Sequence, residues 1–181
     1  MNDKELNPIK DSLTSSSEIL DLGCGAGRNS IYFAEENVRV TSVDVDKTSL
    51  MYLNYKSKAN NLNLSIANDD VLEYLRKNQF KGKFDAVLMV LILNYFSEED
   101  YKELVRLAQL ATKVGGFNYV KLFCSSNNSL KDNDFKSYIE KGDIDDLYLD
   151  WDLSEHFYGE TSHNEKLVGY TFTAEKTAEE Y

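Results

Sequence analysis

The sequence predicts an α/β fold, built as a doubly wound and mainly parallel sheet with helices on both faces. Strand-like apolar runs alternate with helical segments along the 181 residues, and a glycine-rich turn at residues 21–27 joins the first strand to the first helix. Only a short link separates the last two strands, so we expect the last strand to run antiparallel. We assign residues 18–181 to one domain and residues 1–17 to a polar N-terminal arm, mobile unless it folds over a ligand.

Seven segments carry the alternating or continuous apolar patterns of β-strands. They are residues 19–22, 38–44, 62–67, 84–93, 117–124, 151–158 and 166–175. The fourth is an almost uninterrupted apolar run, which is typical of a central strand buried on both faces. Helices are expected over 28–37, over 47–60, from Val71 onward, from the capping-box spacing of Ser97 and Asp100 to Gly115 and Gly116, and over 134–150 with a break at Gly142.

The glycine-rich turn has the pattern Asp-x-Gly-x-Gly-x-Gly, with glycines at positions 23, 25 and 27. A strand, a glycine turn and a helix form the first half of a βαβ nucleotide-binding unit. Glycine allows the sharp bend and the close approach of a ligand, and the helix N-terminus offers unpaired N–H groups. A dinucleotide fingerprint fails because Arg28 stands at the third glycine position, and no Gly-Lys-Ser/Thr follows, which excludes a P-loop. A turn that binds nothing is the simplest alternative, although spare glycines cost stability at such a junction.

Acidic residues follow the second and third expected strands. Asp44 ends the second strand, where nucleoside-binding βαβ units place a carboxylate on the ribose hydroxyls. The alternative for Asp44 is a helix N-cap, but Asp46 lies nearer the next helix and is the better cap. Asp69 and Asp70 follow the third strand, and two roles stay open for them: accepting a hydrogen bond from an adenine amino group, or capping the next helix.

The amino-acid composition disfavours several classes of binding partner. The net charge of −11 disfavours tight binding to nucleic acid and to anionic membranes. No apolar run approaches the roughly 18 residues of a membrane-spanning helix. Cys24 and Cys124 are the two cysteines, too few for a disulfide framework or a metal cluster, so we expect no metal and a cytoplasmic location. A small-molecule substrate and a monomer or homodimer are the expectations.

Three parts of the sequence resemble the class I S-adenosylmethionine (SAM) methyltransferases, which have a Rossmann-like αβα sandwich. They are residues 21–27, Asp44, and the strand from Phe84 with its following helix, glycine pair and strand. Within that superfamily, Gly25-Ala-Gly-Arg-Asn-Ser-Ile-Tyr-Phe-Ala and Thr112-Lys-Val-Gly-Gly-Phe-Asn-Tyr-Val resemble segments of the tellurite-resistance TehB-type methyltransferases. The last hairpin departs from that family, because Gly159-Glu-Thr-Ser-His163-Asn replaces its Gly-Glu-Leu-His-Arg.

The resemblance implies SAM as cofactor, S-adenosylhomocysteine (SAH) as product and a small-molecule acceptor: a chalcogen oxyanion such as tellurite or selenite, a thiol or an amine. Asp44 would bind the ribose, Asp70 and Val71 would flank the adenine, and Met89 and Val90 would line the far side. The implied cofactor residues are Asp21, Gly23, Cys24, Gly25, Gly27, Arg28, Asn29, Asp44, Val45, Asp70, Val71, Met89 and Val90.

Methyl transfer from a sulfonium is an in-line displacement, so positioning supplies much of the rate. A protein base is needed only if the acceptor must lose a proton, and His163 and His156 are the candidates. Tyr95 and Tyr158 offer aromatic walls near a cation. His163 and Tyr95 are therefore the candidate catalytic residues, although a surface position on the hairpin is the simpler interpretation of His163. A non-catalytic SAM- or SAH-binding regulatory domain and a nicotinamide oxidoreductase are the rival hypotheses.

Overall fold

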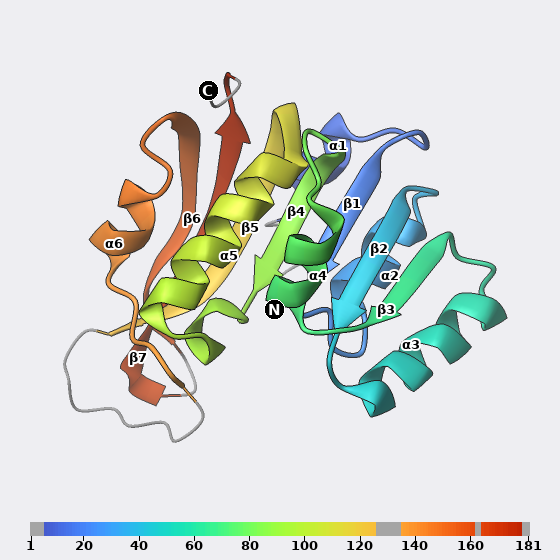
Figure 1. The fold of residues 1–181 in the computed structure, drawn as a ribbon, viewed down its shortest axis with the longest axis horizontal. Helices are drawn as coiled ribbons and strands as arrows, with labels where there is room; N and C mark the ends of the chain where they lie inside the picture. Colours follow the sequence, from blue (N-terminus) through green and yellow to red (C-terminus); the bar gives the residue numbers. More distant parts are fainter. Residues whose placement is uncertain (1–5, 126–134, 162–163, 179–181) are drawn as a thin grey trace.

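The computed structural model describes residues 6–125, 135–161 and 164–178, which form a seven-stranded sheet (Figure 1). Its strand order is β3-β2-β1-β4-β5-β7-β6. The strands are β1 (Glu18–Leu22), β2 (Arg39–Asp44), β3 (Leu64–Asn68), β4 (Phe84–Val90), β5 (Thr112–Ser125), β6 (Trp151–Thr161) and β7 (Asn164–Lys176). The first five pair in parallel, whereas β7 pairs antiparallel with both β5 and β6. The predicted sheet with an antiparallel last strand is confirmed.

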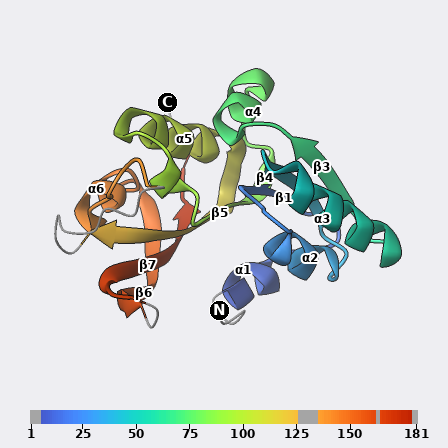
Figure 2. The same cartoon turned by 90° about the horizontal axis from the view of Figure 1, so that it is seen from below.

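Helices cover both faces of this sheet (Figure 2). They are α1 (Asn7–Ser12), α2 (Arg28–Ala34), α3 (Lys47–Ala59), α4 (Val71–Asn78), α5 (Glu98–Ala111) and α6 (Lys141–Asp146), with a 3₁₀ turn η2 (Leu93–Tyr95). Figure 2 shows α1 and α2 on one side and α4 and α5 on the other, which is the predicted αβα sandwich. No helix in the described ranges is both long and apolar enough to cross a membrane.

The strand β4 belongs to the cores on both faces. Val87 and Met89 pack in the cluster beneath α4 and α5, and Ala86 and Leu88 pack in the cluster beneath α1 and α2. All four side chains are fully buried. Burial on both faces explains why this segment is apolar at successive positions, as a central parallel strand should be.

The expected strand at residues 84–93 ends earlier, at Val90. Leu91 takes a left-handed conformation with φ 57°, and its N–H donates to the Lys121 carbonyl at 2.7 Å. The chain then enters η2 instead of extending the strand. The apolar run therefore contains a strand and the start of a turn. This turn lies at the carboxyl ends of the parallel strands.

The helix α5 ends at Ala111, before the glycine pair that was expected to stop it. Thr112 Oγ1 lies 2.8 Å from the Ala108 carbonyl oxygen and 2.7 Å from Asn118 Oδ1, so its single proton is shared between two acceptors, and the Thr112 backbone is already extended. Gly115, with φ 73°, and Gly116 lie inside β5, where the pairing with β4 is irregular. The expected break at Gly142 is also wrong, because this residue lies within α6.

The segment before the sheet contains a helix that the sequence analysis did not predict. Residues 7–12 form α1, and Leu6 and Ile9 are buried in the same cluster as Phe33 of α2. Spacing of three residues places two apolar side chains on one face of a helical turn, which was the missed sequence signal. Residues 1–5 lie outside the described part of the chain.

Candidate functional site

A cavity of about 380 Å³ opens at the carboxyl ends of the parallel strands. It lies where β1 is flanked by β2 on one side and β4 on the other, the switch point at which open α/β sheets bind ligands. The residues lining it follow the ends of β1, β2, β3 and β4, and one comes from a later segment. They are Gly23, Asp44, Val45, Asp70, Val71, Ile92, Tyr95, Phe96 and Lys136.

The glycine turn folds against the end of β2. Gly23, Gly25 and Gly27 all have left-handed backbones, with φ of 71°, 54° and 81°. The N–H groups of Gly23 and Cys24 donate to the Val43 carbonyl at 2.9 and 3.1 Å. Residues with a side chain rarely adopt the left-handed conformation, so the three glycines allow the chain to turn here.

Each glycine meets a different environment. A Cβ at Gly23 would lie 2.7 Å from the Ile92 side chain, and one at Gly27 would overlap Leu53 of α3. A Cβ at Gly25 would meet nothing within 4 Å. Packing therefore requires two of the glycines, whereas the backbone of Gly25 faces open space that a ligand can approach.

Asp44 lines the cavity with its carboxylate fixed by two backbone donors. Its Oδ2 accepts from the Gly25 N–H at 2.7 Å, and its Oδ1 accepts from the Asp46 N–H at 2.8 Å. Each carboxylate oxygen can accept more than one hydrogen bond, so the group keeps capacity for the two hydroxyls of a ribose. Asp46 caps α3 by accepting from Thr48 N at 2.9 Å, which confirms the predicted cap. The ribose role of Asp44 stays a prediction.

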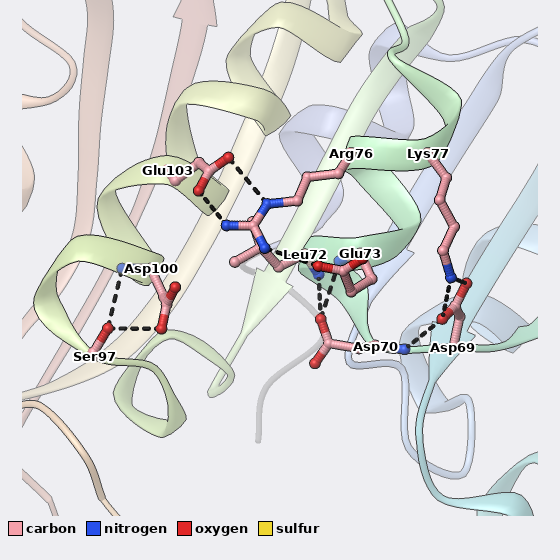
Figure 3. Close-up of polar contacts among 9 residues, drawn as sticks. All are labelled: Asp69, Asp70, Leu72, Glu73, Arg76, Lys77, Ser97, Asp100 and Glu103. Atoms are coloured by element: carbon pink, nitrogen blue, oxygen red, sulfur yellow. Dashed lines mark hydrogen bonds and ion pairs between the residues drawn. The ribbon is translucent and has the colours of Figure 1, made fainter.

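Figure 3 shows the acidic pair after β3. Asp70 Oδ1 accepts from the N–H groups of Leu72 and Glu73 at 2.9 and 3.1 Å, so this residue is the N-cap of α4. Both capping bonds go to Oδ1, which leaves Oδ2 outside the cap. Asp69 instead pairs with Lys77 at 3.0 Å. Since Asp70 and Val71 both line the cavity, the cap is shown and an adenine contact stays open.

The next helical turn anchors α4 to its neighbour. Arg76 donates to Glu73 at 2.8 Å and, through Nε, to Glu103 of α5 at 3.1 Å (Figure 3). These exposed ion pairs stabilise little individually. They nevertheless join α4 to α5 across the face of the sheet next to the cavity.

Asp21 lies beneath the turn with only 1% of its surface exposed. Ser30 Oγ donates to Asp21 Oδ2 at 2.6 Å, and Ser42 Oγ donates to Ser30 Oγ at 2.8 Å. Burial raises the pKa of Asp21 to about 6, against the opposing effect of the Ser30 hydrogen bonds. Its role is therefore to hold β1, α2 and β2 together, since its carboxylate faces the interior.

The remaining predicted residues of the turn gather at the start of α2. Arg28 Nη2 donates to Asn29 Oδ1 at 2.8 Å, and Asn29 is buried in the first turn of the helix. Burial, together with the nearby charges of Asp21 and Asp44, raises the pKa of the Cys24 thiol far above its usual range. Cys24 is therefore a neutral thiol rather than a nucleophile. Across the described residues, no three His, Cys, Asp or Glu side chains group into a metal site.

The far wall of the cavity differs from the expected one. Met89 is fully buried in the core and Val90 packs against the second core cluster. Ile92, which follows the left-handed residue after β4, lines the cavity in their place, and Lys136 joins it from a distant segment. Neither residue was predicted, because no local pattern in the sequence brings Lys136 to this strand end.

Tyr95 is the predicted catalytic residue that the structure places at the cavity, with 45% of its surface exposed. Its ring meets Phe135 edge-on, with centroids 5.5 Å apart. His163 lies outside the described residues. His156 makes a hydrogen bond to Thr173, and Tyr158 packs edge-on against Tyr170; these two β6 residues do not line the cavity.

Replacing Asp21 by asparagine should stabilise the protein at neutral pH. The folded state holds the Asp21 proton up to about pH 6, whereas an unfolded aspartate loses it near about pH 4, so the parent loses stability from this group as pH rises between them. Asparagine still accepts from Ser30 but has no charge to bury. Urea unfolding should show Asp21→Asn gaining about 1–3 kcal/mol over the parent as pH rises through that window, then levelling off. A difference that does not change with pH would contradict the buried-carboxyl assignment.

Known proteins resemble this chain in sequence and in fold. The chain is 27% identical over 144 residues to the probable S-adenosyl-L-methionine-dependent methyltransferase TehB of Haemophilus influenzae (strain 10810), over 80% of this chain and 49% of that protein. It thus spans about half the length of the curated relatives it matches.

Solved structures share the fold. The crystal structure of TehB from Haemophilus influenzae matches with a TM-score of 0.77 and 22% identity, over 97% of this chain and 62% of that chain. A SAM-dependent methyltransferase from Archaeoglobus fulgidus matches with a TM-score of 0.73 and 17% identity, over 96% and 92%. The family model described as "Tellurite resistance protein TehB" matches residues 8–166, most of the chain, and the chain therefore belongs to the TehB family.

Proposed function

We propose that this protein is a SAM-dependent methyltransferase that acts on a small-molecule acceptor. One observation carries the proposal: Asp44 presents a carboxylate, fixed by the N–H groups of Gly25 and Asp46, to a cavity of about 380 Å³ beside a glycine turn. This is the arrangement that a nucleoside with two vicinal hydroxyls requires. The names of the TehB relatives support the choice of cofactor.

The lining residues suit the parts of that cofactor. Asp44 would accept from the ribose hydroxyls, and Val71 and Ile92 would enclose the adenine with apolar surface from both sides. Oδ2 of Asp70, which the helix cap does not use, would accept from the adenine amino group. The open space over Gly25 would admit the rest of the molecule close to the backbone.

SAM supplies a methyl group bonded to a sulfonium, which is an excellent leaving group. The protein then has to hold the acceptor in line and exclude water, and Tyr95 and Phe96 provide aromatic walls for both tasks. Among the described lining residues Lys136 is the one cation and no histidine is present. An acceptor that is already anionic, such as a chalcogen oxyanion or a thiolate, needs no base and is favoured by this charge.

The second candidate is a non-catalytic SAM- or SAH-binding regulatory domain. It is favoured by the departure at the last hairpin, where the arginine of the family pattern is missing. The two candidates share the cofactor site and differ in whether any acceptor is methylated. Binding alone therefore cannot distinguish them, and turnover can.

The cellular location, the substrate class and the oligomeric state are also part of the proposal. Both cysteines, Cys24 and Cys124, are free, and the net charge is −11. These features support a reducing cytoplasm and a small-molecule substrate rather than a nucleic acid. Monomer or homodimer stays a prediction.

Turnover should separate the two candidates. SAH formed from SAM is measured with tellurite, selenite, a small thiol or an amine added in turn. We expect SAH to form with at least one anionic acceptor, and calorimetry to show heat with SAH but none with NAD. If SAH binds and no acceptor raises its production, the regulatory alternative replaces the enzyme.

Asp44→Ala should weaken SAH binding. We expect the parent to bind SAH in the micromolar range, about −8 kcal/mol, and the variant to lose about tenfold or more, because hydrogen bonds to a charged acceptor are lost. Asp46→Ala is the matched control: it removes the cap of α3 and lowers the melting temperature, yet its SAH affinity should stay within about twofold. Equal SAH affinity of Asp44→Ala and the parent would remove the ribose assignment.

Gly25→Ala and Gly82→Ala form a second matched pair. Both glycines are left-handed, with φ of 54° and 49°, and at both an added Cβ meets nothing within 4 Å. The backbone strain should therefore be similar, about 1–2 kcal/mol of stability. Only Gly25→Ala should also raise the SAH Kd, by about tenfold, because its methyl group occupies the space left for the ligand. The same Kd in both variants would show that the space over Gly25 is not used.

A further inference from the structure

We propose that Asn94 is a positioning residue that fixes the wall of the cofactor cavity carrying Tyr95 and Lys136. The proposal rests on the proposed function, since it concerns the same cavity. Asn94 does not line the cavity, but it stands next to Tyr95 in η2 and contacts the segment that carries Lys136. We call Asn94 with its partners Phe123, Lys136 and Ser137 the Asn94 clasp.

The side chain of Asn94 is buried, with 1% of its surface exposed, and its side-chain hydrogen bonds to described residues reach beyond its own element. Nδ2 donates to the carbonyl of Phe123 at 2.8 Å and to that of Ser137 at 3.3 Å. Oδ1 accepts from the Phe123 N–H at 3.0 Å. One side chain therefore joins η2 to the end of β5 and to a segment beyond it.

The backbone of Asn94 completes the clasp. Its carbonyl accepts from the N–H groups of Lys136 and Ser137 at 2.9 and 3.3 Å. These two residues lie outside every helix and strand, and the next regular contact of their segment is the bridge between Ile139 and Cys124 of β5. Among the described residues, the backbone N–H groups of Lys136 and Ser137 thus find their hydrogen-bond acceptor in Asn94, which holds Lys136 at the cavity.

Aromatic packing also holds the segment that carries Lys136 against the cavity wall. Phe135, the residue before Lys136, stacks on Phe123 with centroids 5.9 Å apart and meets Tyr95 edge-on at 5.5 Å. The Ser137 hydroxyl is buried and makes no hydrogen bond within the described part of the chain, so its own side chain does not hold the segment. The amide of Asn94 is therefore the polar anchor, and the ring of Phe135 is the apolar one.

An amide is required at this position because the clasp needs a donor and an acceptor on one short side chain. An aspartate of the same shape could still accept from Phe123 N but would turn a bare oxygen toward two carbonyls in a buried site. Losing the partner of a buried polar group is costly, so the segment should detach from the strand end. Detachment would move Tyr95 and Lys136, which line the same cavity as Asp44.

Asn118 supplies a control for a purely structural role. It is fully buried on β5, where it accepts from the Thr112 hydroxyl at 2.7 Å and donates to the Tyr148 hydroxyl at 3.1 Å. None of these three residues lines the cavity. Asn118→Asp therefore damages a buried amide network of similar kind without touching the cofactor wall.

The test compares SAH affinity by calorimetry in the full chain and its Asn94→Asp and Asn118→Asp variants, at a temperature where all three are folded. Asn94→Asp should raise the SAH Kd by about tenfold or more, whereas Asn118→Asp should lower the melting temperature and leave the Kd within about twofold. Should Asn94→Asp fail to fold, Asn94→Ser takes its place, because it leaves the two backbone bonds available and adds no charge.

A double-mutant cycle tests whether Asn94 acts through the wall. In a Tyr95→Ala/Lys136→Ala background, Asn94→Ser should change the SAH Kd by less than about threefold, since the side chains that it positions are gone. An unchanged Kd on replacing Asn94 in the parent, or an undiminished effect in that background, overturns the proposal and leaves the proposed function standing. Failure of the parent itself to bind SAH overturns both.

Discussion

The hydrogen bond from the Gly25 amide to the Asp44 carboxylate is the contact on which the candidate site depends. It spans 2.7 Å and joins the turn after β1 to the end of β2, two strands that pair in parallel. A bond to an ionised acceptor is stronger than a neutral one and holds the left-handed turn in a single arrangement. Because the Asp46 amide occupies the other carboxylate oxygen, the group has a fixed orientation before any ligand arrives. Parallel pairing thus places the bend beside the carboxylate that the proposed nucleoside site requires.

The same turn is held from below by a buried chain of hydrogen bonds. Asp21 on β1, Ser30 on α2 and Ser42 on β2 are bonded in series, and all three are buried. Burial of the carboxyl group costs free energy, as the raised pKa of Asp21 indicates. In return, the start of α2 is tied to both strands. The glycine turn therefore lies between the Gly25–Asp44 hydrogen bond and the Asp21–Ser30 hydrogen bond. These two contacts hold its three left-handed residues in one conformation.

Local interactions explain which features could be predicted from the sequence. The caps at Asp46 and Ser97 depend on residues two or three positions away, so the pattern of side chains was enough. The end of α5 was missed because the Thr112 hydroxyl bonds both back to Ala108 and forward to Asn118 in the next strand. A glycine pair commonly marks a helix end, but here a contact between two elements ends the helix first.

The candidate site also has a part formed by residues close in sequence and a part formed by distant residues. The half that contains the glycine turn and Asp44 comes from consecutive strand ends, and a motif of short spacing predicts it. The opposite half needs Lys136, which lies far along the chain from Asn94 and reaches the cavity through the Asn94 clasp. No periodicity in the sequence encodes such a contact. The half around the glycine turn thus comes from the strand ends themselves, whereas the other wall is held by hydrogen bonds from Asn94 and by the packing of Phe135.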